Sequence, residues 1–333
     1  MPSRLLRASL SGFALALVSS SQGQAHEIVG NRFFPATLTI DDPGVNDELS
    51  LPTVDSFNTG DVPPVRQRDV SGEFSKRITQ DFAVSFGSTY SFLSPTDPTA
   101  AGANGFQNLE TTFKYRVFKS PEHEFVFSVG LSVEWGGTGA QNVGAEPFNT
   151  YTPTIYFGKG LGDLPDTFSW IRPVAITGQI GYAIPAQDFT NTISFDPIAG
   201  TQTIDTEFHP RVLNWGGSIQ YSMPYLRSAV VDLGLPDFIN HLIPLVEASL
   251  QTPVSNTLTS GTLTTGTINP GVIWVGNYFQ VGVEALIPIN RQSGSNVGVI
   301  AQLHLYLDDI DPRGIGKPIF GGPVQPASPF PRN

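Results

Sequence analysis

The sequence has no cysteine and only two methionines, and charged residues make up just 14% of its 333 positions. Without cysteine the chain cannot form disulfide bonds or thiolate metal sites. Soluble domains carry about a quarter charged residues, so this protein does not have the usual charged surface of a soluble protein. The low charge content therefore indicates surroundings other than water alone.

Long hydrophobic runs are missing as well. Residues 1–25 contain Arg4 and Arg7, a short apolar stretch at 10–18 and a small-residue cleavage site at 23–25, a pattern typical of a secretory signal peptide. No later stretch has the 18 or more apolar residues that a membrane-spanning helix needs. The sequence therefore predicts an exported protein without transmembrane helices.

An excess of basic residues is also absent, since 18 lysines and arginines stand against 29 aspartates and glutamates. Nucleic-acid binding needs basic patches, so we expect no nucleic-acid partner. The sequence lacks a P-loop, a dinucleotide-binding glycine motif and a His-Glu-x-x-His zinc motif. The acidic groups at 41–42 and 308–311 lack a calcium-loop pattern. We interpret them as solvated charge, and we expect no metal and no other cofactor.

A two-residue alternation is the dominant pattern that is present. In 125–135, apolar residues occupy every odd position, while serine, glycine and glutamate occupy most even positions. The same pattern returns in 82–92 and along the rest of the chain. A transmembrane β-barrel needs strands of this kind, because about 9–11 tilted residues cross a bilayer. The pattern therefore predicts strands with one lipid-facing side.

Regular alternation begins at Asp69, and only a weak strand is predicted before it, around 34–40. The alternation predicts eleven strands, near 69–78, 82–92, 106–118, 124–135, 150–159, 169–184, 208–222, 242–252, 266–275, 278–287 and 296–307. Bacterial single-chain barrels have an even number of strands. We therefore expect one more strand in 26–68.

The connections between these strands alternate between short and long, which is typical of a barrel with tight turns on one membrane face. The exception is 223–241, where Pro236 indicates the start of a helical turn. We place the short turns in the periplasm. The predicted fold class is all-β: a transmembrane antiparallel β-barrel of about 12 strands with short periplasmic turns and long extracellular loops.

The signal peptide and the predicted strands divide the chain into four segments: a signal peptide at 1–25, an N-terminal segment at 26–68, the β-barrel at 69–308 and a disordered tail at 309–333. Small residues are common on the predicted inner face. Small side chains do not fill a barrel of about twelve strands, so water or a plug must occupy the lumen. The proline-rich N-terminal segment is therefore expected to supply the first strand, a plug, or both.

Charged residues within the predicted strands lie on the face opposite the apolar one. A lysine or arginine on the lipid face at mid-bilayer would cost on the order of 2–4 kcal/mol. Lys76 is the exception, and we expect it near a strand end. The predicted lumen-lining residues are Glu110, Lys114, Arg116, Glu134, Gln220, Glu247, Glu284, Gln302 and His304. The ionisable members form either a structural salt-bridge network or the lining of a solute path that sets selectivity.

His304 is the histidine that lies in a well-defined predicted strand, where it faces the lumen. A serine–histidine pair on the barrel wall would indicate a hydrolase. A hydrogen-bonded structural histidine is the simpler interpretation. We therefore predict no catalytic residue and no enzymatic activity.

Residues 26–38 (HEIVGNRFFPATL), together with 41–44, 48–52, 179–185 and 241–251, resemble a family of exported barrels named for the meta-pathway of phenol degradation. The resemblance covers most of the chain after the signal peptide. It implies an outer-membrane barrel, and in some members a link to uptake of aromatic or other hydrophobic compounds.

Together these features predict a passive channel or facilitator for small solutes, among them hydrophobic or aromatic ones, in the bacterial outer membrane. The expected partners are the lipid bilayer with its lipopolysaccharide and the outer-membrane assembly machinery. An outer-membrane barrel with a lipid-modifying or purely structural role is the alternative, and a soluble secreted β-sandwich ranks third.

Overall fold

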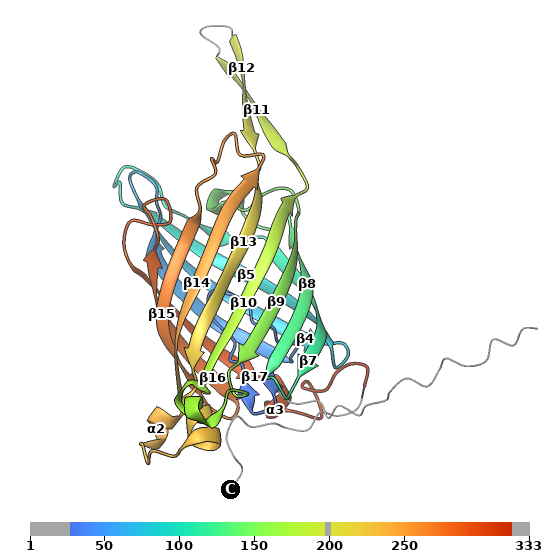
Figure 1. The fold of residues 1–333 in the computed structure, drawn as a ribbon. Helices are drawn as coiled ribbons and strands as arrows, with labels where there is room; N and C mark the ends of the chain where they lie inside the picture. Colours follow the sequence, from blue (N-terminus) through green and yellow to red (C-terminus); the bar gives the residue numbers. More distant parts are fainter. Residues whose placement is uncertain (1–26, 197–200, 322–333) are drawn as a thin grey trace, which may run out of the picture.

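The computed structural model describes residues 27–196 and 201–321, so the predicted signal peptide lies outside the described residues. A single antiparallel sheet of 13 strands closes on itself through the pairing of β4 with β5 (Figure 1). Short β6 (Ala103–Phe106) only extends the sheet beside β5. The remaining twelve form the barrel wall: β3 (Glu48–Asn58), β4 (Val65–Arg77), β5 (Phe82–Pro95), β7 (Leu109–Ser120), β8 (Phe125–Trp135), β9 (Thr150–Gly160), β10 (Val174–Pro185), β13 (Arg211–Tyr221), β14 (Leu242–Ser255), β15 (Thr265–Val275), β16 (Phe279–Pro288) and β17 (Gly298–Tyr306).

All eleven strands predicted after Asp69 are present, but the position predicted for the first strand was wrong. It is Glu48–Asn58, which pairs with β17 on one side and β4 on the other. The alternation in this strand is hard to recognise because its register with β4 shifts between Ser50 and Thr53, around Pro52. The barrel therefore begins at Glu48, within 26–68, where one more strand was expected.

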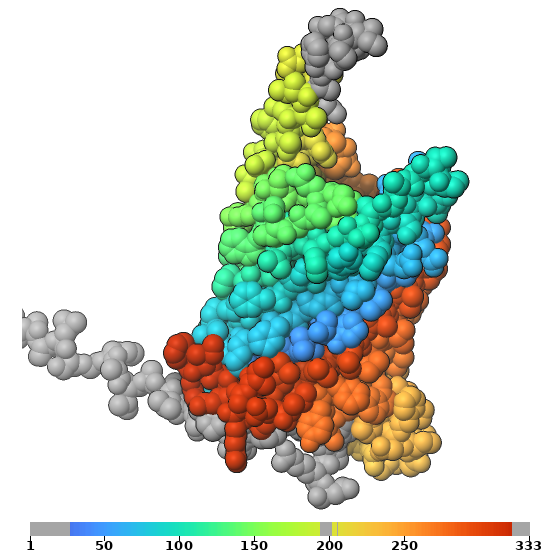
Figure 2. Space-filling model, turned by 180° about the vertical axis from the view of Figure 1, so that it is seen from behind, coloured from blue at the N-terminus to red at the C-terminus, as the bar shows by residue number. Residues whose placement is uncertain are grey.

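The apolar positions of the wall strands face outward, as the alternation predicts. Ile219, Val283 and Val299 are 61%, 45% and 48% exposed, whereas the alternate positions Gln280 and Glu284 are buried. Seen from behind, the strands run obliquely around a continuous wall (Figure 2). No helix in the described part of the chain is long and apolar enough to cross a membrane. The closed sheet with its apolar exterior is a transmembrane β-barrel.

The two ends of the barrel differ. At the long-loop end, β11 (Phe189–Asp196) and β12 (Thr201–Phe208) form a hairpin that projects beyond the wall (Figure 1) and that the alternation did not predict. The opposite end carries short turns and α2, which begins after Pro236 as predicted. The short helices are η1 (Gln141–Val143), η2 (Asp166–Ile171), α1 (Met223–Tyr225), η3 (Leu226–Val230), α2 (Asp237–Asn240) and α3 (Leu307–Ile310).

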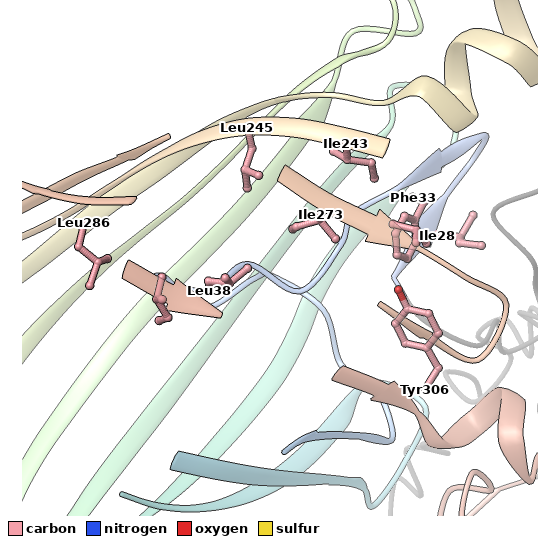
Figure 3. Packing of buried hydrophobic residues seen from close by; sticks show 10 residues of the cluster. Ile28, Phe33, Leu38, Ile243, Leu245, Ile273, Leu286 and Tyr306 are labelled. Atoms are coloured by element: carbon pink, nitrogen blue, oxygen red, sulfur yellow. The ribbon is translucent and has the colours of Figure 1, made fainter. Parts of the chain in front are cut away.

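Residues 27–47 lie inside the barrel, and we refer to them as the plug. The plug starts with a small hairpin of β1 (Ile28–Val29) and β2 (Arg32–Phe33). Its apolar side chains form two clusters with the wall, the larger of which is drawn in Figure 3. One cluster joins Ile28, Phe33 and Leu38 to Ile243, Leu245, Ile273, Val275, Leu286, Ile300 and Tyr306, and the other joins Val29 and Phe34 to Val126 and Ala175.

Two wall glycines make this close approach possible. A Cβ atom at Gly282 would lie 2.5 Å from Cδ1 of Leu38, and one at Gly158 would lie 3.0 Å from the ring of Phe34. The weak strand predicted at 34–40 was wrong because this stretch packs inside the barrel instead of joining the sheet.

The predicted disordered tail is corrected for residues 309–321. The Ile319 and Phe320 amides donate hydrogen bonds to the carbonyl oxygens of Arg77 and Ile78. The Lys76 amine donates to the carbonyl oxygens of Ile315 and Lys317, at 2.6 and 2.7 Å. Lys76 therefore lies at a strand end, as predicted, where this segment of the chain covers its charge. Residues 322–333 lie outside the described residues.

The outward apolar face can be tested with a charge at its centre. Val283 occupies the middle of β16 and faces outward. We expect Val283→Arg to lower the free energy of unfolding in lipid vesicles by about 2–4 kcal/mol, because it places a cation in hydrocarbon. Urea titration of the folded barrel measures this. Thr89→Arg, which faces the lumen, is the matched control and should cost little, whereas equal losses at both positions would contradict the assigned faces.

Candidate functional site

A cavity of about 480 Å³ lies in the lumen between the plug and part of the wall. Plug residues 36–42 form one side of it, and inward-facing residues of β3, β4, β5, β7, β8 and β17 form the other. A second cavity of about 230 Å³ continues toward β9, β10 and β13. The two cavities share Asp41, Glu73, Glu110 and Thr112, so these residues surround the place where the cavities meet.

Carboxylates and hydroxyls dominate the larger cavity. Among its described lining residues, His304 is the one basic side chain. The carboxylates come from the plug and from four strands, and they are Asp41, Asp42, Glu48, Glu73, Glu110 and Glu134. The hydroxyl side chains are Thr37, Thr39, Ser50, Thr53, Ser71, Ser85, Ser88, Thr89 and Thr112. The cavity is therefore hydrophilic and carries an excess of negative charge.

Lys114 of β7 is a buried cation that contacts two residues of the cavity lining, Asp41 and Asp42, and the plug neutralises it. Its Nζ donates to Oδ1 of Asp41 at 2.7 Å and to the carbonyl oxygen of Asp42 at 2.9 Å, and it lies 4.7 Å from the centroid of the Tyr156 ring. Burial, together with the nearby charge of Glu48, raises the pKa of the Asp42 carboxyl to about 8. Asp41, whose carboxylate contacts Lys114 directly, supplies its counter-charge.

Further ion pairs hold the plug at the short-turn end of the barrel. Glu27 pairs with Arg116 at 2.8 Å and with Lys119 at 3.3 Å. Arg32 pairs with Glu124 at 3.2 Å. Each pair joins one plug residue to the wall or to a turn of the wall, and both plug side chains are fully buried. The plug is therefore fixed by charges that lose their partners if it moves away.

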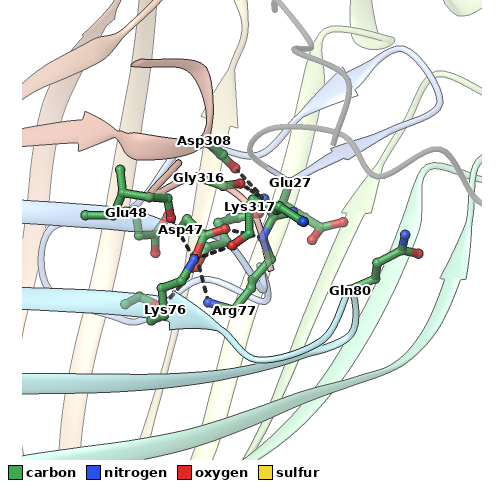
Figure 4. A network of polar contacts seen from close by, with 12 residues as sticks. Glu27, Asp47, Glu48, Lys76, Arg77, Gln80, Asp308, Gly316 and Lys317 are labelled. Carbon is green, nitrogen blue, oxygen red and sulfur yellow. Dashed lines mark hydrogen bonds and ion pairs between the residues drawn. The ribbon is translucent and has the colours of Figure 1, made fainter. Parts of the chain in front are cut away.

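The end of the plug belongs to a denser network, drawn in Figure 4. The buried carboxylate of Asp47 contacts Nζ of Lys76 at 2.5 Å and Nε of Arg77 at 2.7 Å. Arg77 also pairs with Asp308 at 3.5 Å and donates to the carbonyl oxygen of Gly316. One buried network thus ties together the plug, β4 and the residues after the last strand.

Glu247 of β14 holds the middle of the plug. Its carboxylate accepts hydrogen bonds from the amides of Leu38 and Thr39, at 3.1 and 2.8 Å, and from the Thr39 hydroxyl. Glu284 of β16 is buried beside it. A carboxylate that binds plug amides serves to position the plug.

The nine residues predicted to line the lumen all occupy inward positions of the wall, but they divide into groups. Glu110, Glu134, Gln302 and His304 line the larger cavity. Lys114, Arg116 and Glu247 contact the plug, while Gln220 and Glu284 are buried on the inner face of the wall. The sequence left two roles open for the ionisable residues, a structural salt-bridge network or the lining of a solute path. Lys114 and Arg116 belong to a structural network with the plug, whereas Glu110 and Glu134 face the cavity.

Several functional residues were missed, and one interpretation was wrong. Asp42 and Asp308 are only 4% and 1% exposed, so the acidic groups at 41–42 and 308–311 are not simply solvated charge. Glu73 shares the inward face of β4 with Ser71 and Ser75, so the alternation contained the signal for it. No local pattern indicates the partners of the plug carboxylates.

Ser50 and His304 form the serine–histidine contact that the sequence raised. Ser50 Oγ lies 2.8 Å from Nδ1 of His304, whose Nε2 lies 3.3 Å from Glu48. All three line the larger cavity. Within the described residues, no group of three or more histidine, aspartate or glutamate side chains is arranged to hold a metal ion.

No protein-family model matches the chain, and no curated protein matches it either. Among solved structures the chain is similar to the COG4313 outer membrane channel from Pseudomonas putida F1, with 11% identity and a TM-score of 0.49 over 82% of this chain and 99% of that chain. It is also similar to the KdgM porin, with 13% identity and a TM-score of 0.40 over 76% and 98% of the two chains. LpxR from Salmonella typhimurium gives 12% identity and a TM-score of 0.40 over 78% and 99%.

These likenesses are distant, so the barrel assignment is based on the strand pairing and sheet closure of this chain. Membership of the family named for the meta-pathway of phenol degradation stays a prediction, because no family model matches.

The network around Asp47 can be tested by neutralising its carboxylate. We expect Asp47→Asn to destabilise the end of the plug by about 3 kcal/mol, because it removes the buried carboxylate that contacts both Lys76 and Arg77. Hydrogen exchange of the amides in 27–47 would speed up accordingly. Exposed Asp61 provides the matched control, and Asp61→Asn should leave exchange in the plug unchanged. Unaltered exchange in Asp47→Asn would contradict a plug held by these charges.

Proposed function

We propose that this protein is a passive channel of the bacterial outer membrane for small hydrophilic solutes, with a preference for cations. The observation that carries the proposal is the cavity of about 480 Å³ inside the barrel, which is lined by carboxylates and hydroxyls. Lys114, which is buried in the lumen, is already paired with Asp41 of the cavity lining. The surplus of negative charge is therefore available to a passing solute.

Carboxylates around a narrow path favour cations for an electrostatic reason. Rings of aspartate and glutamate give cation selectivity in channels. The surrounding protein and lipid have a low dielectric constant, which focuses the field of these charges into the lumen. Nothing in this arrangement requires energy input, so the proposed transport is driven by the concentration gradient of the solute.

The cavity chemistry favours polar solutes over the hydrophobic or aromatic ones that the family resemblance implies. Its apolar lining is limited to Ala36, Leu38 and Ile40 of the plug, and Tyr156 is the aromatic side chain that lines the smaller cavity. A site for an apolar ligand would be lined mainly by hydrophobic and aromatic side chains. We therefore propose small hydrophilic solutes.

We also propose that the protein lies in the bacterial outer membrane, and the barrel architecture supports this location. Closed β-barrels with short turns on one side and long loops on the other are typical of that membrane. The signal peptide at 1–25, contact with lipopolysaccharide and assembly by the outer-membrane machinery stay predictions.

A hydrolase is the second candidate, and the contact between Ser50 and His304 is the observation that favours it. Both side chains face the lumen, whereas membrane lipids contact the outer surface of the wall. A lipid acyl group therefore does not reach Ser50 from the bilayer. We propose a structural role for this pair, which joins β3 to β17 at the seam of the barrel.

The channel proposal predicts a measurable ion preference. In planar bilayers with a KCl gradient, we expect a reversal potential of the sign given by K⁺ permeation. Replacing Glu73, Glu110 and Glu134 together with glutamine should move the reversal potential toward zero, because it removes cavity charge. Glu122→Gln, in an exposed turn, is the control with no expected change. A non-conducting protein, or an anion-selective one, would overturn the proposal.

The position of the plug in the lumen leads to a second prediction, which concerns the single-channel conductance in the same recordings. A variant lacking residues 27–47 should show a larger single-channel conductance, because the clusters that join the plug to the wall no longer fill the lumen. Its preference for cations should fall, because Glu27, Asp41 and Asp47 are lost. Heat-modifiable migration on gels verifies that the barrel has folded, and unchanged conductance of the folded variant would argue against an obstructing plug.

A further inference from the structure

Two short helices at the short-turn end of the barrel expose large apolar side chains. On η2, Phe168 and Trp170 are 50% and 56% exposed. On α2, which is labelled in Figure 1, Phe238 is 63% exposed. η2 leads into β10 and α2 leads into β14, and in the sheet only β13 separates these two strands. The two helices therefore belong to one sector of the barrel, and we refer to them together as the ledge.

α2 lies against the outer face of the wall. Trp274, near the end of β15, stands between Ile273 and Val275, which are completely buried, so its side chain points outward. The ring of Phe238 stacks on Trp274, with the ring centroids 6.5 Å apart and the planes 20° apart. His241, directly after α2, stacks on the same indole with a centroid distance of 5.3 Å. α2 is therefore attached to the lipid-facing side of the wall.

η2 is attached to the same side. Tyr221, the last residue of β13, follows the buried Gln220, so its side chain points outward. Its hydroxyl donates a hydrogen bond to the carbonyl oxygen of Trp170 at 3.2 Å. Two residues further from the end of the wall, Ile219 of β13 is opposite Ile176 of β10, and both are exposed on the outer face. The apolar outer surface of the wall therefore continues onto the ledge.

The charged groups of the two helices have partners. Asp166 of η2 pairs with Arg172 at 2.8 Å, and Asp237 of α2 pairs with Arg227 at 3.3 Å. Aromatic side chains gather where a membrane meets water, and amphipathic helices lie in the plane of that interface. Exposed aromatic rings next to paired charges therefore match the headgroup region of a bilayer.

Phospholipid is the occupant that fits this surface. The ledge adjoins Ile176 and Ile219, which belong to the part of the wall that lipid covers. A protein bound to the exposed ring of Phe238 or Trp170 would have to displace lipid from the neighbouring wall. Phospholipid, in contrast, covers the wall and the ledge as one continuous surface.

We propose that η2 and α2 lie in the headgroup region of the bilayer at the short-turn end, with Phe168, Trp170 and Phe238 inserted next to the phospholipid chains. The connections that precede β10 and β14 then belong to the membrane-embedded surface of the protein. The ledge holds this end of the barrel at a fixed depth, because moving it into water would expose its aromatic rings. This inference needs the closed barrel but does not depend on the proposed channel function.

Single cysteines test the proposal, because the chain has no cysteine of its own. Phe168→Cys and Phe238→Cys are labelled with a nitroxide in the full protein, in vesicles of phosphatidylethanolamine and phosphatidylglycerol. Oxygen concentrates in lipid, and a polar nickel complex stays in water. We expect the ratio of their collision rates with the label to be several-fold higher at both positions than in Glu122→Cys, in the exposed turn at the same end. Val283→Cys, on the lipid face of β16, is the positive control.

Two results of the labelling would overturn the proposal. A ratio at positions 168 and 238 equal to that of Glu122→Cys would place the ledge in water. Dipolar broadening between labels on different molecules, lost on dilution with unlabelled protein, would assign the ledge to a second copy of the chain. Heat-modifiable migration on gels verifies that each variant has folded, and neither result depends on conduction.

A second measurement keeps Phe168 and Phe238 intact. Iodide stays in water, and it is added on both sides of the vesicles to quench tryptophan fluorescence. We expect the wild type and Trp170→Phe to be quenched to the same extent, because lipid protects the indole of Trp170. A quenched component that is present in the wild type and lost in Trp170→Phe would contradict the insertion of the ledge.

Discussion

Closure of the sheet into a barrel, in which the first wall strand, β3, pairs with the last, β17, is the constraint on which the whole structure depends. A strand edge in hydrocarbon would leave backbone amides and carbonyls without partners, at a cost of several kcal/mol each. Glu48–Asn58 removes that edge by pairing with β17 and β4. Once the barrel is closed, each strand has one face toward lipid and one toward the lumen, and this division decides where charge can be placed.

Because the polar face of every strand points inward, the lumen contains both the plug and the polar cavity. The charges of Arg116 and Lys114 cannot face lipid, and the plug supplies Glu27 and Asp41 to pair with them. On the side of the cavity, Glu73 and Glu110 remain in contact with solvent. The same inward face thus serves as a docking surface in one part of the barrel and as a solute-facing surface in another.

Much of the fold could be predicted from local pattern. The alternation located eleven strands and their lipid-facing sides, and Pro236 indicated the short helix at its correct place. The first strand was misplaced because Pro52 interrupts its alternation. For the site, the two-residue alternation placed Glu110, Glu134, Gln302 and His304 on the inner face. It did not indicate which of the inward residues the plug would cover.

The sequence by itself determined which side of each strand is apolar, because side-chain direction in a strand depends only on whether a position is odd or even. Only the tertiary structure decided that residues 27–47 turn into the lumen, that Asp47 meets Arg77, and that Glu73, Glu110 and Glu134 line one cavity. These contacts depend on the register between strands and on barrel closure, which are set by pairing between residues far apart in the chain.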